Sequence, residues 1–444
     1  LMAIGLVATF LDHEEVTAAL RQVASQPQGT DQGRRAAKLI LQRFLDEPIG
    51  EGPADGPYNA EVADNRSLQA ALAQGESNPL ALIEYLRGLD LQEPDLVLAV
   101  VQTLQEMGTR QAVGLLRMIA QDVREEIAYE ALQALSTIRR PEATQALQTL
   151  IPISAPGLRP SAERALRKLR FSGVAVEELP APDPGWRALV SPMDGQGQQN
   201  VWFVQGNRQT GRVQLLSVLL SDQTGAVEAV GHPQASPQSA PRRRSTGYVH
   251  DLALPDGTES VLMLEASFDL GRRLVADALA QNRQTQIPVA GELRLLSPWL
   301  WGFGGADILP PRRLPGGRDT KDSLVGESGR LLGHPAFASW TLRSESTLQA
   351  AEEAIRHPGW DREVWVRRLA AEQAAELEAR QVISQRLISM SEWLLLAGEE
   401  QLSPIALAAA EALLGENAQE IPLVRALIQR DLTLVIDSLQ QTAS

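Results

Sequence analysis

The chain has 444 residues, too many for one ordinary domain, and at about 150 residues per domain the length indicates roughly three. Its 41 Lys and Arg face 55 Asp and Glu, and the net charge of −14 argues against a dedicated nucleic-acid binder and against a surface that seeks anionic lipid. The chain has no cysteine, which excludes disulfides, a thiolate nucleophile, Cys-ligated zinc and iron–sulfur clusters.

The first segment, Leu1–Leu11, is apolar but shorter than the about 20 residues that a membrane-spanning helix needs. It has neither the basic segment nor the small-residue cleavage site of a signal peptide. We therefore expect a core helix or strand of the first domain. Since no later stretch is long and apolar enough to span a bilayer, we expect a cytoplasmic protein without a membrane partner.

The first domain, predicted for residues 1–175, has the apolar spacing of helices from Glu14 onward. Its clearest part, residues 78–170, repeats itself. A shift of 31 residues superimposes Leu104 on Leu135, and a further shift of 34 superimposes Leu135 on Leu169. Each repeat reads as two short amphipathic helices separated by a tight break. Such a helix pair cannot bury its apolar face alone, so the pattern predicts an α-solenoid of stacked pairs.

The sequence of these repeats resembles the short HEAT-repeat family of bacterial helical repeats. The likeness lies in Val123–Leu135, followed by Pro141–Leu147, and covers about a fifth of the chain. The resemblance implies an α-solenoid architecture and hardly constrains function, because such repeats occur in scaffolds, in lyase-like proteins and in DNA-repair enzymes.

A Pro-rich linker is predicted at residues 176–185, because its prolines prevent a helix from continuing. Residues 186–300 then read as a small α+β domain. Strands are expected from β-branched, aromatic and leucine-rich runs at 186–190, 201–204, 212–220 and 260–266, with tight turns at Asp194–Gly195 and Asp256–Gly257. Asp269 is the expected N-cap of a helix that ends near Asn282.

The last third returns to helices. Residues 301–340 are predicted as a Gly/Pro/Arg-rich loop region, and 231–247 as a second mobile loop. Residues 341–444 form the predicted C-terminal helical domain, so the expected fold is mainly α and multidomain. The expected helices of this last domain are one long or once-broken helix over 363–395, then 404–414 and 422–439.

The residues that could support chemistry are few. Of the five histidines, no two are spaced to place both imidazoles on one helix face. A site assembled from His250, Asp251 and a distant serine has no support from spacing, and no GxSxG motif is present. The glycine-rich stretches 194–200 and 302–307 match neither a P-loop nor a dinucleotide-binding motif. We therefore predict no catalytic residue, no metal site and no cofactor.

Basic residues gather in two places that we take as the candidate interaction surface. Arg139, Arg140 and Arg164 belong to a basic cluster at the end of the repeats. A second group, in the predicted loop region, consists of Arg312 and Arg313 beside Trp299 and Trp301. Arginines beside aromatic side chains can hold phosphate or contact a protein.

The leading interpretation is a non-catalytic protein–protein interaction or scaffold protein that binds another protein through its solenoid surface. The alternative is an enzyme or small-ligand-binding protein with its site in the central α+β domain, which requires a polar, concave cluster there. A third interpretation, a HEAT-type nucleic-acid binder, is disfavoured by the acidic charge balance and rests on the local arginine cluster alone.

Overall fold

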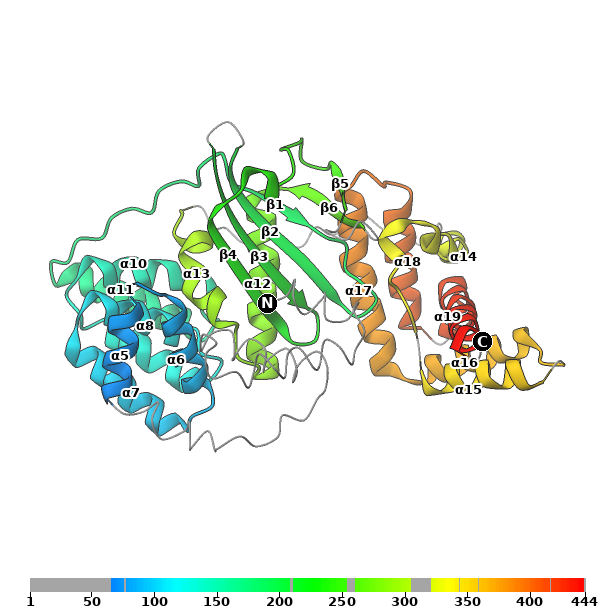
Figure 1. Ribbon diagram of the computed structural model, residues 1–444, viewed down its shortest axis with the longest axis horizontal. Coiled ribbons are helices and arrows are strands. Elements are labelled where there is room, and N and C mark those ends of the chain that lie inside the picture. The colour runs from blue at the N-terminus through cyan, green and yellow to red at the C-terminus, as the bar shows by residue number, and fades with distance from the viewer. Residues whose placement is uncertain are drawn as a thin grey trace, which may run out of the picture. The chain divides into compact units, whose positions relative to one another are not determined.

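The computed structural model describes residues 65–75, 77–207, 211–253, 260–304, 321–342, 344–357, 359–415 and 417–442. They all belong to one compact unit, Ala63–Ser444. The chain is mainly helical, with a six-stranded antiparallel sheet in the middle and helices before and after it, as expected (Figure 1). The predictions for Leu1–Leu11, for the helices before residue 65 and for the turn at Asp256–Gly257 lie outside the described residues.

Seven α-helices of the described residues precede the sheet, and we call them the helical array. They are α5 (Asn65–Gly75), α6 (Leu80–Asp90), α7 (Pro94–Met107), α8 (Arg110–Ile119), α9 (Glu125–Leu135), α10 (Pro141–Leu150) and α11 (Arg159–Phe171), with the short 3-10 helix η1 (Ile151–Ile153) after α10. The helix boundaries coincide with the predicted breaks. Gly108 ends α7 with a φ of 55°, and the Thr109 side chain caps α8 by accepting a bond from the N–H of Ala112.

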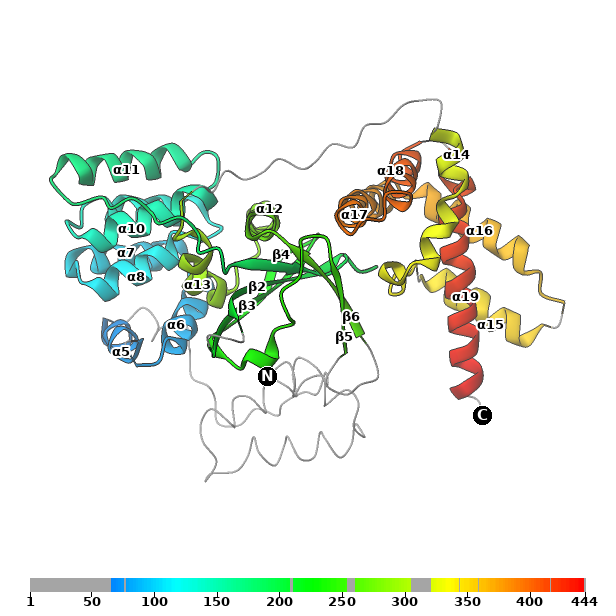
Figure 2. The same ribbon diagram turned by 90° about the horizontal axis from the view of Figure 1, so that it is seen from above.

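Alternate helices of the array pack on one another in two layers. In the outer layer α7 packs on α9 and α9 on α11, whereas in the inner layer α6 packs on α8 and α8 on α10 (Figure 2). The repeated leucines Leu104, Leu135 and Leu169 are each 0% exposed. The sequence shift that relates them therefore relates buried positions on successive outer helices.

The predicted linker has neither helix nor strand, and its first half lies against α10. Thr144 Oγ1 donates a hydrogen bond to the carbonyl of Ala175, and Gln148 Nε2 donates one to the carbonyl of Glu177. The Pro-rich segment thus follows the array before the sheet begins.

The sheet has the strand order β4-β3-β2-β1-β6-β5, and every neighbouring pair is antiparallel. The strands are β1 (Arg187–Val190), β2 (Gln198–Asn207), β3 (Arg212–Ser221), β4 (Gly225–Ala235), β5 (Val249–Ala253) and β6 (Ser260–Ala266). The expectation of a loop over 231–247 was wrong at its start, because β4 continues to Ala235. The strands expected from the sequence included neither β4 nor β5. Both are edge strands with exposed polar residues, so neither has the apolar pattern that marks a strand.

Helix α12 (Phe268–Thr285) packs across the sheet. Its N-cap is Ser267, whose side chain accepts from the N–H of Leu270, and not Asp269 as predicted, which lies in the first turn. A Cβ at Gly271 would lie 2.6 Å from the Phe203 ring and 2.8 Å from Ala188 Cβ. Glycine at this position therefore lets the helix approach the sheet closely.

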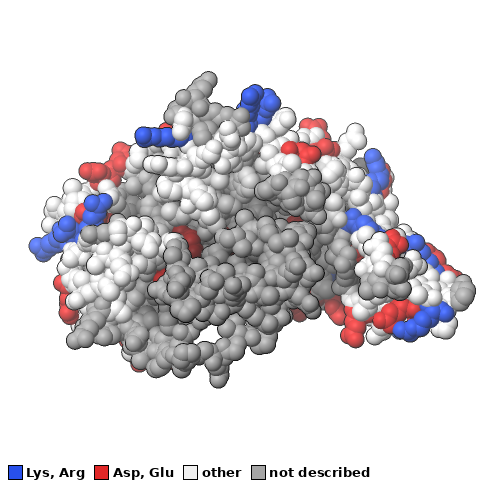
Figure 3. Space-filling view, viewed as in Figure 1, with Lys and Arg blue, Asp and Glu red and all other residues white. Residues whose placement is uncertain are grey.

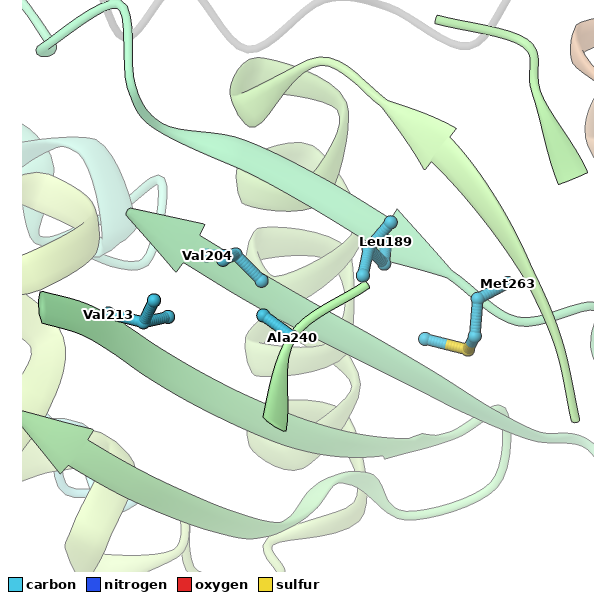
Figure 4. Packing of buried hydrophobic residues seen from close by; sticks show 5 residues of the cluster. All are labelled: Leu189, Val204, Val213, Ala240 and Met263. Atoms are coloured by element: carbon cyan, nitrogen blue, oxygen red, sulfur yellow. The ribbon is translucent and has the colours of Figure 1, made fainter. Parts of the chain in front are cut away.

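The other face of the sheet has its own buried apolar cluster. Leu189, Val204, Val213 and Met263 come from four different strands, and Ala240 comes from the segment after the 3-10 helix η2 (Pro237–Ser239) (Figure 4). Each of the five is at most 5% exposed. The sheet is therefore buried on both faces at its centre.

In the described residues after α12, every element is a helix. The helices are α13 (Gly291–Trp301), α14 (Lys321–Gly326), α15 (Glu345–Arg356), α16 (Arg362–Ala375), α17 (Leu377–Leu396), α18 (Leu402–Leu413) and α19 (Pro422–Thr442), with 3-10 helices η4 (Ser328–Gly333), η5 (Pro335–Phe337) and η6 (Ala418–Glu420). The predicted helix over 363–395 is broken once, at Glu376. The loop expected over 301–340 contains α14, η4 and η5 in its described part.

Helix α17 is attached to the sheet by polar contacts. Arg386 forms an ion pair with Asp222 at 2.6 Å, and the Trp393 indole donates to the carbonyl of Val190 at 3.0 Å. The Trp393 side chain is 3% exposed. These contacts connect the C-terminal helices to the sheet.

Candidate functional site

Helix α11 places a row of cations on the outside of the array. Ser161, Ala162, Ala165 and Leu169 are buried against the neighbouring helices, which leaves the arginines of this helix on the opposite face. At the end of that face Phe171 is 84% exposed. The spacing of small and apolar residues along α11 therefore decides which side chains point to solvent.

A second group of cations adjoins this helix. Lys168 Nζ lies 3.3 Å from Ser136 Oγ, which brings α11 beside the turn that carries Arg139 and Arg140. We call the combined surface the basic end. It consists of Arg139, Arg140, Arg159, Arg164, Arg167, Lys168 and Arg170, all of them exposed.

Most cations of the basic end have no ion-pair partner among the described residues. Glu142 lies 3.5 Å from Arg140 and Glu163 lies 3.8 Å from Arg167, so two of the seven cations are in ion pairs there. Lys and Arg atoms lie at the left edge of Figure 3, over the end of the array where Figure 1 places α10 and α11. In a chain with a net charge of −14, this is a local reversal of sign that attracts anionic groups.

Of the other predicted interaction residues, Trp299 and Trp301 belong to α13 and not to the helices of the basic end. Trp301 is 1% exposed and packs against the Arg272 guanidinium, 5.1 Å from its ring centre, so it belongs to the core. Trp299 is half-buried and would lie 3.5 Å from a Cβ at Gly231 on β4. Arg312 and Arg313 lie outside the described residues.

The inner layer of the array is in contact with α13, which packs on α6, α8 and α10. Pro298 lies inside α13 and has no N–H, so the carbonyl of Arg294 loses its usual partner in the helix. Arg117 Nη1 of α8 donates to that carbonyl at 2.8 Å, and Gln121 Nε2 donates to it at 3.1 Å. Burial lowers the pKa of Arg117 to about 10. Arg117 and Gln121 of the array therefore donate hydrogen bonds in place of the N–H that Pro298 lacks.

A buried ion pair also connects α13 to α6 of the array. Arg294 is 0% exposed and holds both carboxylate oxygens of Asp90, at 3.0 and 3.2 Å. Burial raises the pKa of Asp90, and the nearby Arg294 charge opposes this increase. The sequence interpretation missed this interface. Its one sequence signal was a proline inside a helical pattern, which implies a carbonyl that needs another donor.

The central sheet contains a polar cluster, which the enzyme alternative requires, but it is buried. Glu265 Oε2 lies 2.6 Å from Arg187 Nη1 and 2.8 Å from His250 Nε2, and each of these side chains is at most 8% exposed. Burial lowers the pKa of Arg187, and Glu265 opposes this shift. Asp251 is exposed on the opposite side of β5. The structure thus pairs His250 with Glu265 and separates it from Asp251.

This cluster holds three strands and a loop together. Arg187, His250 and Glu265 lie on β1, β5 and β6, and Arg187 Nη2 also donates to the carbonyl of Pro241 at 2.6 Å. Within the described ranges, no three His, Asp or Glu side chains are arranged to hold a metal ion. No described helix combines the length and apolar character needed to cross a membrane.

Comparison of the chain with protein-family models, with curated proteins and with solved structures found no match.

Proposed function

We propose that this protein is a non-catalytic scaffold that binds another protein through the surface of a HEAT-like α-solenoid formed by its helical array. The proposal is supported by the two-layer packing of α6 to α11 and by the regular breaks between the helices of each pair. Solenoid surfaces commonly serve as binding sites for extended partners. The expected cytoplasmic location stays a prediction.

The observation that carries this proposal is the exposed charge of the basic end. The inner layer already contacts α13, so the surface available to a partner is the end of the array at α11 and at the turn with Arg139 and Arg140. Seven exposed cations, two of them in ion pairs among the described residues, complement an acidic segment. The exposed Phe171 adds an apolar contact at the rim of that surface.

The two alternatives have less support. The polar cluster around Glu265 is almost fully buried, whereas a catalytic site needs a concave surface that substrate can reach. A nucleic-acid binder also needs a basic surface, so it shares the main observation and differs in which polyanion binds better.

Charge reversal tests the proposal. The variant Arg139→Glu/Arg140→Glu/Arg164→Glu removes three cations and adds three anions at exposed positions. We expect it to weaken binding of a fluorescent polyglutamate peptide by more than about tenfold, equivalent to about 1.4 kcal/mol. Fluorescence anisotropy at physiological salt measures this change.

The matched control is Arg356→Glu/Arg367→Glu/Arg368→Glu on α15 and α16, where the arginines are also exposed. It makes the same change in net charge and should leave peptide binding unchanged. Equal losses in both variants would overturn the proposed surface. Tighter binding of a single-stranded oligodeoxynucleotide than of the peptide would favour the nucleic-acid interpretation instead.

A further inference from the structure

A cavity of about 480 Å³ lies between the array and α12, and Arg139 and Arg140 of the basic end are not among its lining residues. Its walls come from the α8–α9 connection, from the segment between α10 and α11, and from the last turns of α12. This volume lies within the roughly 300–1,000 Å³ of small-molecule sites.

The described walls are mostly apolar. Ala128, Leu150, Leu158 and Leu279 line the cavity, and each of them is buried. Apolar walls favour a ligand that brings its own apolar surface out of water, at about 25 cal/mol for each Å² buried.

One cationic side chain lines this mostly apolar cavity. Arg283 is the cation among the described lining residues, and its Nη1 donates to the carbonyl of Ile153 at 3.1 Å. No carboxylate pairs with Arg283 in the part of the chain that the structure describes. Burial lowers the pKa of Arg283, and the nearby charge of Arg159 lowers it further. An anion placed here would compensate a charge that the protein leaves unpaired.

The neighbouring acids limit the charge of that anion. Asp122 directs both oxygens at Arg124, with contacts of 3.0 and 2.8 Å, so its charge is already matched. Glu125 is exposed at the rim. A doubly charged phosphate would meet Glu125 with one arginine to neutralise it, whereas a single planar carboxylate matches one guanidinium fork.

We propose that this cavity binds a small monocarboxylate with an apolar body. The carboxylate lies on the unpaired edge of Arg283, and the apolar body packs against Leu150, Leu158 and Leu279. This ligand site is separate from the partner surface proposed above, and either can fail without the other.

Isothermal titration calorimetry of the full chain with octanoate tests the proposal, with 1-octanol and octylamine as neutral and cationic analogues of the same length. We expect octanoate to bind more tightly than either analogue by at least tenfold. Equal binding of 1-octanol, or no binding of octanoate, would overturn the assignment without any variant.

Two variants locate the site. Arg283→Gln should weaken octanoate binding at least tenfold, whereas the matched control Arg367→Gln on the exposed face of α16 should leave it unchanged. Ala280→Trp keeps Arg283 and fills the cavity that Ala280 lines, so it should abolish binding even if Arg283→Gln fails to fold. Unchanged octanoate binding in Ala280→Trp would place the ligand elsewhere and overturn the proposal.

Discussion

The two layers of the helical array use the same residue type in opposite ways. In the inner layer, Arg117 donates into α13, and Arg294 of α13 returns the contact through Asp90. In the outer layer, Arg164 and Arg170 of α11 point to solvent. One set of arginines joins parts of the chain to one another, and the other is available to a partner.

This difference shows why an arginine count does not identify a binding surface. The charge of a buried arginine in an ion pair is neutralised within the chain, and loss of the partner leaves an isolated buried charge. An exposed arginine contributes little to folding but attracts anions at long range. The burial of each side chain decides between these roles, and the sequence alone does not state it.

The largest expected effect on stability comes from removing the ion pair between Arg294 of α13 and Asp90 of the inner layer. Arg294→Met leaves the Asp90 carboxylate without its bidentate partner at a buried interface, so it should lower the free energy of unfolding by about 3–5 kcal/mol. Arg170→Met on the outer layer should change it by less than about 0.5 kcal/mol. Urea denaturation followed by circular dichroism measures both.

A double variant separates the ion pair from the packing of the helix. Asp90→Asn/Arg294→Met removes both charges, so it should recover part of the stability lost by Arg294→Met alone. Equal stability of Arg294→Met and Arg170→Met would remove the contrast between the layers.

The second prediction concerns the core that both layers share. Leu135 is 0% exposed, and Leu135→Ala should cost about 2–5 kcal/mol through the lost burial and the cavity left behind. Gln133→Ala, two residues earlier on α9, should cost about 0.5 kcal/mol or less. Equal denaturation midpoints for the two variants would contradict the repeat register.

Much of the array was predictable, because its periodicity is local. The shift that relates Leu104, Leu135 and Leu169 marks buried positions, and Gly108 and Pro141 mark the breaks. The strands at the centre of the sheet were likewise predicted from their apolar runs. These features depend on residues a few positions apart, which a sequence displays directly.

What the sequence could not predict depends on contacts between distant residues. Arg294 and Asp90 form an ion pair although they are 204 positions apart in the sequence. His250 contacts Glu265 on the neighbouring strand and not the adjacent Asp251. Edge strand β4 also escaped prediction, because one of its sides faces solvent and its residues do not alternate clearly. In the candidate basic end, Arg139, Arg140 and Arg164 were identified from the sequence, whereas the hydrogen bond from Lys168 to Ser136, which brings α11 beside the turn with Arg139 and Arg140, was not.

The smallest expected effect is a comparison of two tyrosines, one in each layer. Tyr85 on α6 is 7% exposed, and its hydroxyl has no hydrogen-bond partner among the described residues, whereas Tyr129 on α9 is 39% exposed. Burial raises the pKa of Tyr85 from 10.0 to about 12, because the phenolate loses its hydration. Between these two values the folded chain retains a proton that the unfolded chain releases, so stability falls as the pH rises through this window.

Absorbance titration of the phenolate tests that difference. The wild-type curve minus the Tyr85→Phe curve should show one step with a midpoint at about pH 12. In Tyr129→Phe, the step at about pH 12 should remain, because Tyr85 is still present. At neutral pH, Tyr85→Phe should change stability by about 1 kcal/mol or less, since the hydroxyl that it removes makes no hydrogen bond. A step at about pH 10 for Tyr85 would mean that water reaches this side of α6, and the inner layer would then be more open than its contacts with α13 imply.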